Sequence, residues 1–228
     1  MDSSSPTLLQ DRAAAGRRLV EPLLKYAHRP DVIVLALPRG GVPVAYEVAA
    51  ALEVRLDLML VRKLGVPSHE EFAMGAIASG GIQILNEHAL RVHPIDKATF
   101  DAVVARETRE LLRREQVYRG ERAPAQLKDQ VVILIDDGLA TGASMMAAIH
   151  AVRVHAPARI VVAVPVAPIE TAEALRNEVD ELICPLIPDW LMSIGRWYLD
   201  FSQTSDAQVI KLLRRAWEKE LSPGDGSA

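Results

Sequence analysis

The sequence predicts an α/β fold in which helices flank a central, mostly parallel sheet. Short apolar runs without a break, such as 131–135, are typical of parallel strands that are covered on both faces. These runs alternate along the chain with segments of helical periodicity, which is the pattern of repeated strand–helix units. The chain has 228 residues, half of them hydrophobic, so it can bury one sizeable core, and we expect a single domain over 1–228.

The expected elements follow from local patterns along the chain. Residues 8–27 place leucines and alanines at helical spacing after a Ser-Pro start signal, which predicts a first helix. The charged segment 97–118 has Arg106, Glu110 and Arg114 at i,i+4 spacing, so its helix is expected to have a solvated face. Further strands are expected at 31–37, 56–61, 131–135, 159–166 and 181–186, with a Gly-interrupted strand pair within 74–84, and further helices at 42–52, 143–155 and 204–220.

Composition limits the function classes. The formal net charge of −4 provides no broad positive field, which disfavours nucleic acid as a partner. Cys184 is the only cysteine, which excludes an intrachain disulfide and a cysteine-rich metal site, and its apolar neighbours indicate a buried, inert thiol. The first residues lack the features of a signal peptide, and no apolar run approaches membrane-spanning length. We therefore expect a cytoplasmic protein without a membrane partner.

Two carboxylates and a small-residue turn follow the apolar run 131–135. Asp136 and Asp137 offer acceptor-only oxygens that suit a vicinal diol. The turn Thr141–Ser144 stands at the expected start of a helix, where backbone N–H groups and two hydroxyls suit a phosphate. A ribose 5-phosphate carries both groups. The pattern also fits a buried strand before a capped helix, whereas a P-loop nucleotidase is excluded because the chain has no Gly-Lys-Ser/Thr.

This segment resembles the 5-phosphoribosyl-1-pyrophosphate (PRPP) motif of type I phosphoribosyltransferases, in which a hydrophobic run, two acids and a short spacer precede Thr-Gly-x-Thr/Ser. The resemblance implies that Asp136 and Asp137 hold the ribose hydroxyls, with Mg²⁺ as cofactor bound near them. It also implies that the 5′-phosphate is wrapped by Ala140, Thr141, Gly142, Ala143 and Ser144. Gly138 stands where the motif often has a branched apolar residue, which loosens the turn.

A second strand-to-helix junction carries Arg39, Gly40 and Gly41. The two glycines allow close backbone approach and Arg39 supplies a guanidinium fork, so a diphosphate would suit this turn. Taken alone, the pattern also fits a tight connection before a helix. It resembles the pyrophosphate loop of the same family, which implies that these three residues bind the pyrophosphate of PRPP.

Two adjacent cations, Arg62 and Lys63, end an apolar run and precede the polar segment Gly65–Phe72. We expect this segment to be a mobile lid that brings Lys63, or else Arg62, to the departing pyrophosphate. Solvated cations at a strand end are the alternative. His69 fits surface decoration, or a proton shuttle near neutral pH.

Residues 188–203, with other peripheral segments, are expected to form a small hood. This region holds two of the three tryptophans, and in the family the hood often places an aromatic ring on the base. Trp197 or Tyr198 would serve that role, although aromatic residues at such spacing also fit core packing.

The resemblance extends from roughly Asp31 to Val166, and the layout looks like a bacterial group of predicted phosphoribosyltransferases whose acceptor is unassigned. It implies that a nitrogenous base attacks C1 of PRPP as pyrophosphate leaves. Asp136 and Asp137 would orient the diol, while Arg39 and Lys63 would take up the leaving charge. A PRPP-sensing regulator and a hydrolase or salvage enzyme for phosphoribosyl compounds are the alternatives. A homodimer is compatible with each of these.

Overall fold

The computed structural model describes residues 8–67, 69–92 and 94–221, and it confirms the expected α/β fold. The elements are α1 (Arg12–Leu23), η1 (Leu24–Tyr26), β1 (Val32–Ala36), α2 (Gly41–Leu52), β2 (Arg55–Leu58), β3 (Val61–Val66), β4 (His69–Ala78), β5 (Ile82–Leu85), α3 (Glu87–Val92), α4 (Lys97–Arg119), β6 (Val131–Ile135), α5 (Ala143–Val154), β7 (Arg159–Ala163), α6 (Ile169–Arg176), β8 (Glu181–Ile183), η2 (Ile194–Trp197) and α7 (Asp206–Leu221). Among these described helices, none has the length and apolar character needed to span a bilayer.

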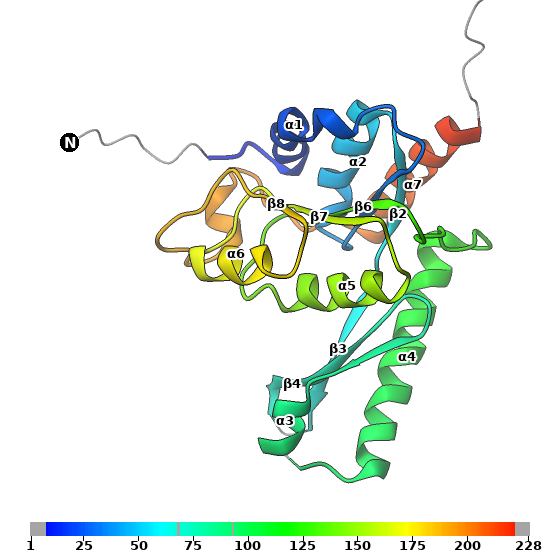
Figure 1. The fold of residues 1–228 in the computed structure, drawn as a ribbon, viewed down its shortest axis with the longest axis vertical. Helices are drawn as coiled ribbons and strands as arrows, with labels where there is room; N and C mark the ends of the chain where they lie inside the picture. The colour runs from blue at the N-terminus through cyan, green and yellow to red at the C-terminus, as the bar shows by residue number, and fades with distance from the viewer. Residues whose placement is uncertain (1–7, 68, 93, 222–228) are drawn as a thin grey trace, which may run out of the picture.

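The central sheet has the strand order β2-β1-β6-β7-β8, and every pairing in it is parallel. Helices α1, α2 and α7 cover one face, and α5 and α6 cover the other (Figure 1). All five residues of β1 and of β6 are buried. Alternate residues of each strand enter the cores on opposite faces, Val34 on one and Leu35 on the other. This double coverage explains why the apolar runs in the sequence have no polar alternation.

Strands β7 and β8 each end three residues before the expected boundary, at Ala163 and Ile183. A further difference concerns the strand expected at 56–61. The apolar run 56–61 was expected to be one strand, but β2 ends at Leu58 and the chain changes sheets over the next two residues. The Met59 N–H donates to the Ala36 carbonyl of β1 (2.9 Å), whereas Leu60 exchanges backbone and side-chain hydrogen bonds with Ser79. Both Met59 and Leu60 are buried, so hydrophobicity alone does not reveal the change of partner.

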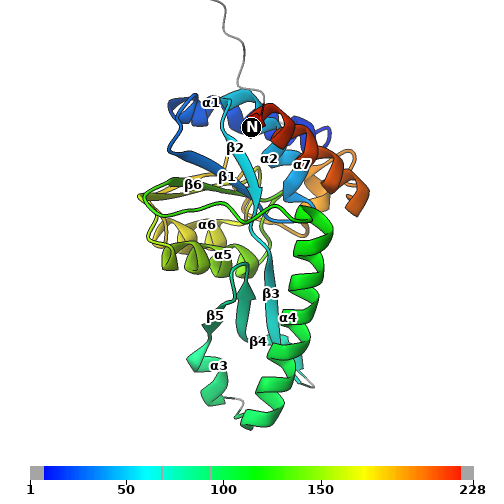
Figure 2. The same ribbon diagram turned by 90° about the vertical axis from the view of Figure 1, so that its right-hand side faces the viewer.

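Residues 61–119 form an arm that projects from the central sheet (Figure 2). The arm contains a three-stranded antiparallel sheet, β3-β4-β5, with α3 and the long α4. The expected Gly-interrupted strand pair corresponds to β4 and β5. Helix α4 is solvated on one side as expected, and it buries Val103 and Leu111 on the other, in the core shared with β3.

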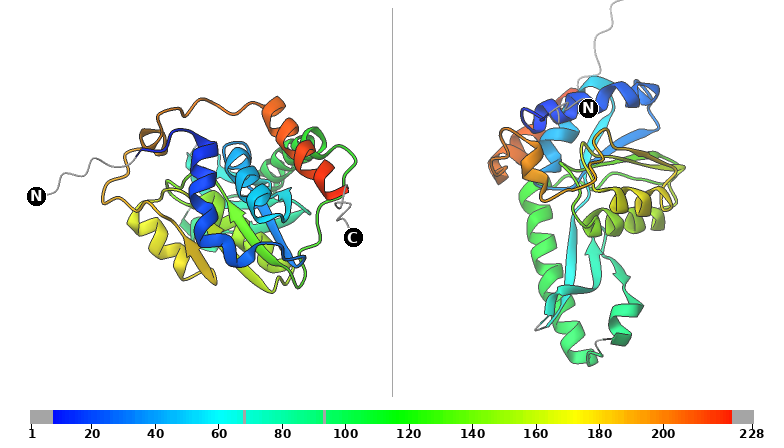
Figure 3. Two further views of the ribbon diagram at one scale, coloured as in Figure 1. Left: turned by 90° about the horizontal axis from the view of Figure 1, so that it is seen from above. Right: turned by 90° about the vertical axis from the view of Figure 1, so that its left-hand side faces the viewer.

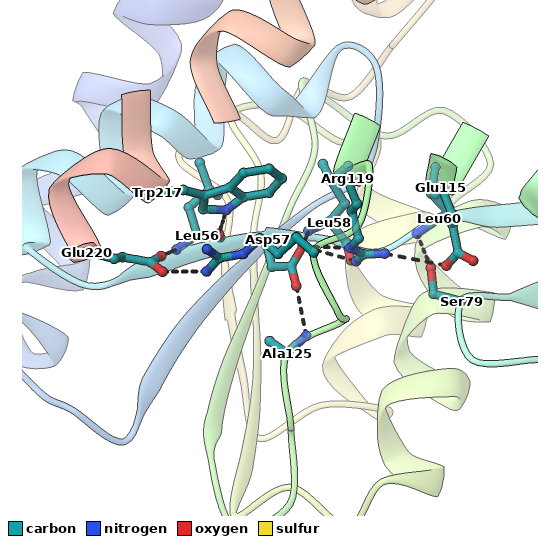
Figure 4. A network of polar contacts seen from close by, with 11 residues as sticks. Leu56, Asp57, Leu58, Leu60, Ser79, Glu115, Arg119, Ala125, Trp217 and Glu220 are labelled. Carbon is teal, nitrogen blue, oxygen red and sulfur yellow. Dashed lines mark hydrogen bonds and ion pairs between the residues drawn. The ribbon is translucent and has the colours of Figure 1, made fainter. Parts of the chain in front are cut away.

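A buried ion pair anchors the arm to the central sheet (Figure 4). Arg119, at the end of α4, donates from Nε to Asp57 Oδ1 (3.0 Å) and from Nη2 to the Leu58 carbonyl (2.6 Å). The other Asp57 oxygen accepts from the Ala125 N–H (2.9 Å). The two charged side chains are 3% and 4% exposed. A buried charge of this kind is tolerated only when it is paired and hydrogen-bonded, so this pair fixes where α4 meets β2.

The segment between β8 and α7 crosses the molecule beside the beginning of α1 (Figure 3). Its backbone pairs with residues just before α1, through the bridge between Leu9 and Tyr198. Helix α7 then returns to the central sheet, where Trp217 Nε1 donates to the Leu56 carbonyl of β2 (2.8 Å). The two ends of the described chain therefore pack on the same face of the sheet.

Replacing Arg119 with Met should lower the free energy of unfolding by about 3–5 kcal/mol, because Asp57 would stay buried without its partner. Urea denaturation measures this. The exposed Arg109 on the same helix is the control, and Arg109→Met should change stability by no more than about 0.5 kcal/mol. Equal stabilities of the two variants would contradict an anchoring role for the buried pair.

Candidate functional site

The site begins where the two central strands end. Strands β1 and β6 are neighbours, and Ala36 lies level with Ile135 in their register. The Leu37 N–H donates to the Ile135 carbonyl (2.9 Å), which extends the pairing by one residue. The loops after both strands therefore leave the same edge of the sheet side by side, each leading into a helix, α2 or α5. This edge is where open parallel sheets bind ligands.

The two loops are in direct contact through glycines. A Cβ on Gly40 would lie 2.0 Å from Asp137 Oδ2, and a Cβ on Gly41 would lie 2.7 Å from the Ile135 carbonyl oxygen. Gly40 has an ordinary φ of −62°, so space and not backbone conformation excludes a side chain there. The peptide bond between Pro38 and Arg39 is cis. The predicted pyrophosphate loop and the predicted carboxylate pair thus pack directly against each other.

Asp136 is only partly buried. Its Oδ1 accepts a hydrogen bond from the Asp137 N–H (2.8 Å). Desolvation of the carboxyl, and next the negative charge of Asp137, raise the pKa of Asp136 well above its usual range. A ligand that brings hydroxyl donors or a cation to this carboxylate would offset that unfavourable environment.

Asp137 is buried and already has partners. Its Oδ2 accepts from Arg12 Nε at 2.7 Å, and its backbone carbonyl accepts from the Tyr198 hydroxyl at 2.6 Å. Sequence reasoning missed Arg12, which lies far from both motifs in the chain. The sequence around Arg12 indicates only that a helix begins there, after the N-cap Asp11, and not that this residue contacts Asp137.

The turn Thr141–Ser144 lies at the beginning of α5, as the sequence predicts. The chain remains irregular through Gly142, and α5 begins at Ala143. Gly142 has φ 72°, and a Cβ there would lie 2.7 Å from Thr171 Cγ2. Thr141 and Ser144 are exposed, so the first turn of a twelve-residue helix faces outward with its positive dipole end.

Arg39 stands at the rim of the same site. Its Nη1 lies 3.6 Å from Asp206 Oδ1 at the beginning of α7. The same Asp206 oxygen accepts from the Tyr118 hydroxyl on α4 (2.7 Å). Burial, and then this contact with Asp206, raise the pKa of Tyr118 to about 12. The arm, α7 and the loop after β1 therefore meet at one polar cluster.

The segment Gly65–Phe72, which was expected to be a mobile lid, belongs mostly to the hairpin of β3 and β4. Gly65 lies within β3 and His69 begins β4; Ser68 and the side chains of residues 69–72 lie outside the part of the chain described. Leu64 and Val66 are buried, and this period-2 pattern was hidden by the neighbouring Gly and Pro. Movement of this hairpin as a lid stays a prediction.

The two cations of the hairpin differ in their surroundings. Arg62 Nε donates to Glu107 Oε2 on α4 at 2.9 Å, which holds Arg62 against that helix. Desolvation opposes ionisation of Glu107, but hydrogen bonds from Arg106 and Arg62 outweigh it and lower the pKa of this carboxyl. Lys63 is exposed. A role for either cation at a ligand stays a prediction.

The predicted stacking role of Tyr198 is wrong in this structure. The Tyr198 side chain lies in the core, at 5% exposure, and its hydroxyl donates a hydrogen bond to the Asp137 carbonyl. Trp197 is partly buried against the same core. The exposed aromatic ring of the expected hood is Trp190, at 86%. Cys184 was expected to be buried and is partly buried, and desolvation raises the pKa of its thiol to about 11.

Comparison with known proteins identifies relatives across most of the chain. A family model described as "Phosphoribosyl transferase domain" matches residues 7–201. A Mycobacterium tuberculosis protein named "Putative phosphoribosyl transferase", present in two strains, is 41% identical over 209 residues, 92% of this chain. That match covers 47% of the relative, so the chain spans about half the length of the curated relatives it matches.

Solved structures agree with the fold. The crystal structure of TT1426 from Thermus thermophilus is 41% identical, has a TM-score of 0.81, and covers 91% of this chain and 98% of its own. The AQ2163 protein from Aquifex aeolicus is 12% identical with a TM-score of 0.50, over 81% of this chain and 78% of its own. The second likeness supports the fold alone.

The turn before α5 should hold an inorganic anion. Crystals grown in sulfate should show an ion against the N–H groups of Thr141–Ser144. Gly142→Ala should remove it, because both φ and the Thr171 methyl group oppose a side chain there. Gly81→Ala is the matched control, since Gly81 has a similar φ of 76° with open space around it. An ion retained in Gly142→Ala, or absent from the unmodified protein, would contradict the assignment.

Proposed function

Because the chain belongs to the phosphoribosyl transferase family, we propose that it binds PRPP with Mg²⁺ and transfers the 5-phosphoribosyl group. The acceptor is a nitrogenous base, and pyrophosphate is the other product; in the reverse direction the base is released from its nucleotide as pyrophosphate attacks C1. The observation that supports this most strongly is the contact of Gly40 and Gly41 with the carboxylate pair. One ligand that carries a diol, a phosphate and a diphosphate could contact both of these loops at once.

Each part of the proposed ligand has a chemically matched partner. The 5′-phosphate would take the helix start at Thr141–Ser144, where two hydroxyls and the dipole favour an anion. The ribose hydroxyls would donate to Asp136, because one oxygen of the Asp137 carboxylate already accepts from Arg12. The diphosphate would lie along Gly40 and Gly41, with the Arg39 guanidinium released from Asp206 to pair with it.

The donor set fits a magnesium ion that arrives with the substrate. Mg²⁺ is usually held by one or two carboxylates together with phosphate oxygens and retained waters. Asp136 can supply such a carboxylate oxygen, while Asp137 Oδ2 is bonded to Arg12. When bound, the ion would neutralise part of the pyrophosphate charge.

In the proposed reaction, charged side chains stabilise the charges that develop on the ribose ring and on the leaving group. The nitrogen lone pair of the acceptor forms a bond to C1, the bond from C1 to the pyrophosphate oxygen breaks with its electron pair, and the acceptor proton passes to solvent. Positive charge develops on the ribose ring during this step, near the carboxylate of Asp136. Negative charge develops on the leaving group, beside Arg39 and within reach of a cation brought by the arm. Fixed groups of this kind stabilise the transition state more than the ground state.

The function is tested first at Asp136. Asp136→Asn should weaken PRPP binding in the presence of Mg²⁺ by about 10- to 100-fold, because the amide keeps the shape but loses the charged acceptor. Calorimetric titration measures the affinity. Asp189→Asn, an equal change at an exposed acid, is the control and should bind as the unmodified protein does. Unchanged affinity in Asp136→Asn would contradict the diol assignment.

Catalysis is tested at Lys63. Exchange of labelled pyrophosphate into PRPP, with a panel of bases and their nucleotides, should detect turnover. Lys63→Ala should lower the exchange rate about a hundredfold while PRPP affinity changes little, since the charge is needed as pyrophosphate departs. Lys128→Ala, at another exposed lysine, is the control. Full activity in Lys63→Ala would contradict its role, and binding without exchange by the unmodified protein would favour a sensor.

A further inference from the structure

Two segments from opposite ends of the chain form a clasp beside the carboxylate pair. We define the clasp as Leu9–Arg12 together with Trp197–Ser202. The Leu9 N–H donates to the Trp197 carbonyl (2.8 Å), and the Leu199 N–H donates to the Leu9 carbonyl (2.8 Å). The Asp200 N–H continues the ladder to the Gln10 carbonyl (2.9 Å). These bonds fix the beginning of α1 against the hood segment.

Arg12 projects from the clasp onto Asp137. The Asp11 carboxylate accepts from the Ala14 N–H (2.7 Å), which makes Arg12 the first residue of α1. The Arg12 guanidinium donates from Nε to Asp137 Oδ2 (2.7 Å) and from Nη1 to the Ser202 carbonyl (2.6 Å). The side chains of Arg12 and Asp137 are 11% and 12% exposed. A planar fork can serve both acceptors at once, which a lysine ammonium cannot do with the same geometry.

Aromatic residues of the clasp complete the enclosure. The Arg12 guanidinium carbon lies 4.0 Å from the ring centroid of Phe201, and that ring lies 4.9 Å from the ring of Tyr198. The Tyr198 hydroxyl donates to the backbone carbonyl of Asp137 (2.6 Å). The clasp therefore holds Asp137 at both its side chain and its backbone.

The glycine loop also packs against the Asp137 carboxylate. A Cβ on Gly40 would be 2.0 Å from Oδ2, the same oxygen that accepts from Arg12. The carboxylate is thus confined between α1 and the loop after β1. If Arg12 were displaced, any movement of the Asp137 carboxylate would also disturb its packing against Gly40 and the position of the adjacent Asp136.

We propose that Arg12 is a positioning residue for the ribose-phosphate site, acting through Asp137; this inference rests on the proposed function. Arg12 balances the buried charge of Asp137 and fixes its carboxylate, which leaves Asp136 as the acid that contacts the ligand directly. Because Arg12 also bonds to Ser202, the position of Asp137 depends on the contact between residues 197–202 and the beginning of α1. A purely structural role would only join α1 to residues 197–202 and would leave ligand binding unaffected in the folded variant.

The test compares the single variants Arg12→Met, Arg12→Lys and Asp137→Asn with the double variant that combines Arg12→Met and Asp137→Asn. Arg12→Met should weaken PRPP binding in the presence of Mg²⁺ by about 10- to 100-fold, and Arg12→Lys should recover only part of the loss. Once Asp137 is replaced, Arg12→Met should weaken binding by little more, because Arg12 acts through that residue. Arg17→Met, at an exposed arginine of the same helix that pairs with Glu47 at 3.5 Å, is the control.

Unchanged binding by Arg12→Met, or losses that multiply in the double variant, would overturn the proposal. Backbone hydrogen exchange at residues 197–202 supplies a readout that needs no ligand, and it should rise in Arg12→Met but not in Arg17→Met. If Arg12→Met does not fold, Tyr198→Phe removes only the bond to the Asp137 carbonyl, and it should still weaken PRPP binding. An unmodified protein that does not bind PRPP would refute the proposed function, whereas unchanged hydrogen exchange in folded Arg12→Met would refute the clasp separately.

Discussion

The parallel hydrogen-bonded pairing of β1 with β6 is the constraint on which the candidate site depends. It places Ala36 level with Ile135, so the two following loops start from the same edge of the sheet. Residues without side chains at Gly40 and Gly41 then let the loops touch, with Asp137 filling the space that a Cβ would need. A shift of one residue in this register would invert the faces of β1 and separate the predicted diphosphate and diol surfaces.

The same physical rule acts at two distant points around this sheet. In each, a buried aspartate near the carboxyl end of a strand is paired with an arginine from a remote helix: Asp57 with Arg119, and Asp137 with Arg12. A buried carboxylate without such a partner would be strongly unfavourable, so each pair fixes the approach of one element. The first pair anchors the arm, and the second connects α1 and, through Ser202, the segment before α7 to the candidate site.

Local patterns were sufficient for the fold and for the two loops. Unbroken apolar runs indicated β1 and β6, and the adjacent acids and glycines indicated the two loops that meet at the candidate site. Contacts between remote segments were not predictable in this way: nothing near Arg12 or Tyr198 in the sequence indicates that both bond to Asp137. The hairpin was missed for a different reason, because Gly65 and Pro67 interrupt a period-2 pattern that is only a few residues long.

The central claim is that the loops after β1 and β6 form one binding surface for PRPP. A crystal structure of the protein with PRPP and Mg²⁺ tests it most directly. We expect one ligand whose 5′-phosphate lies on Thr141–Ser144 while its diphosphate lies along Gly40 and Gly41, with the ribose hydroxyls at Asp136. A ligand bound elsewhere, such as the groove between α2 and α7 that Tyr46 and Arg215 line, would contradict it.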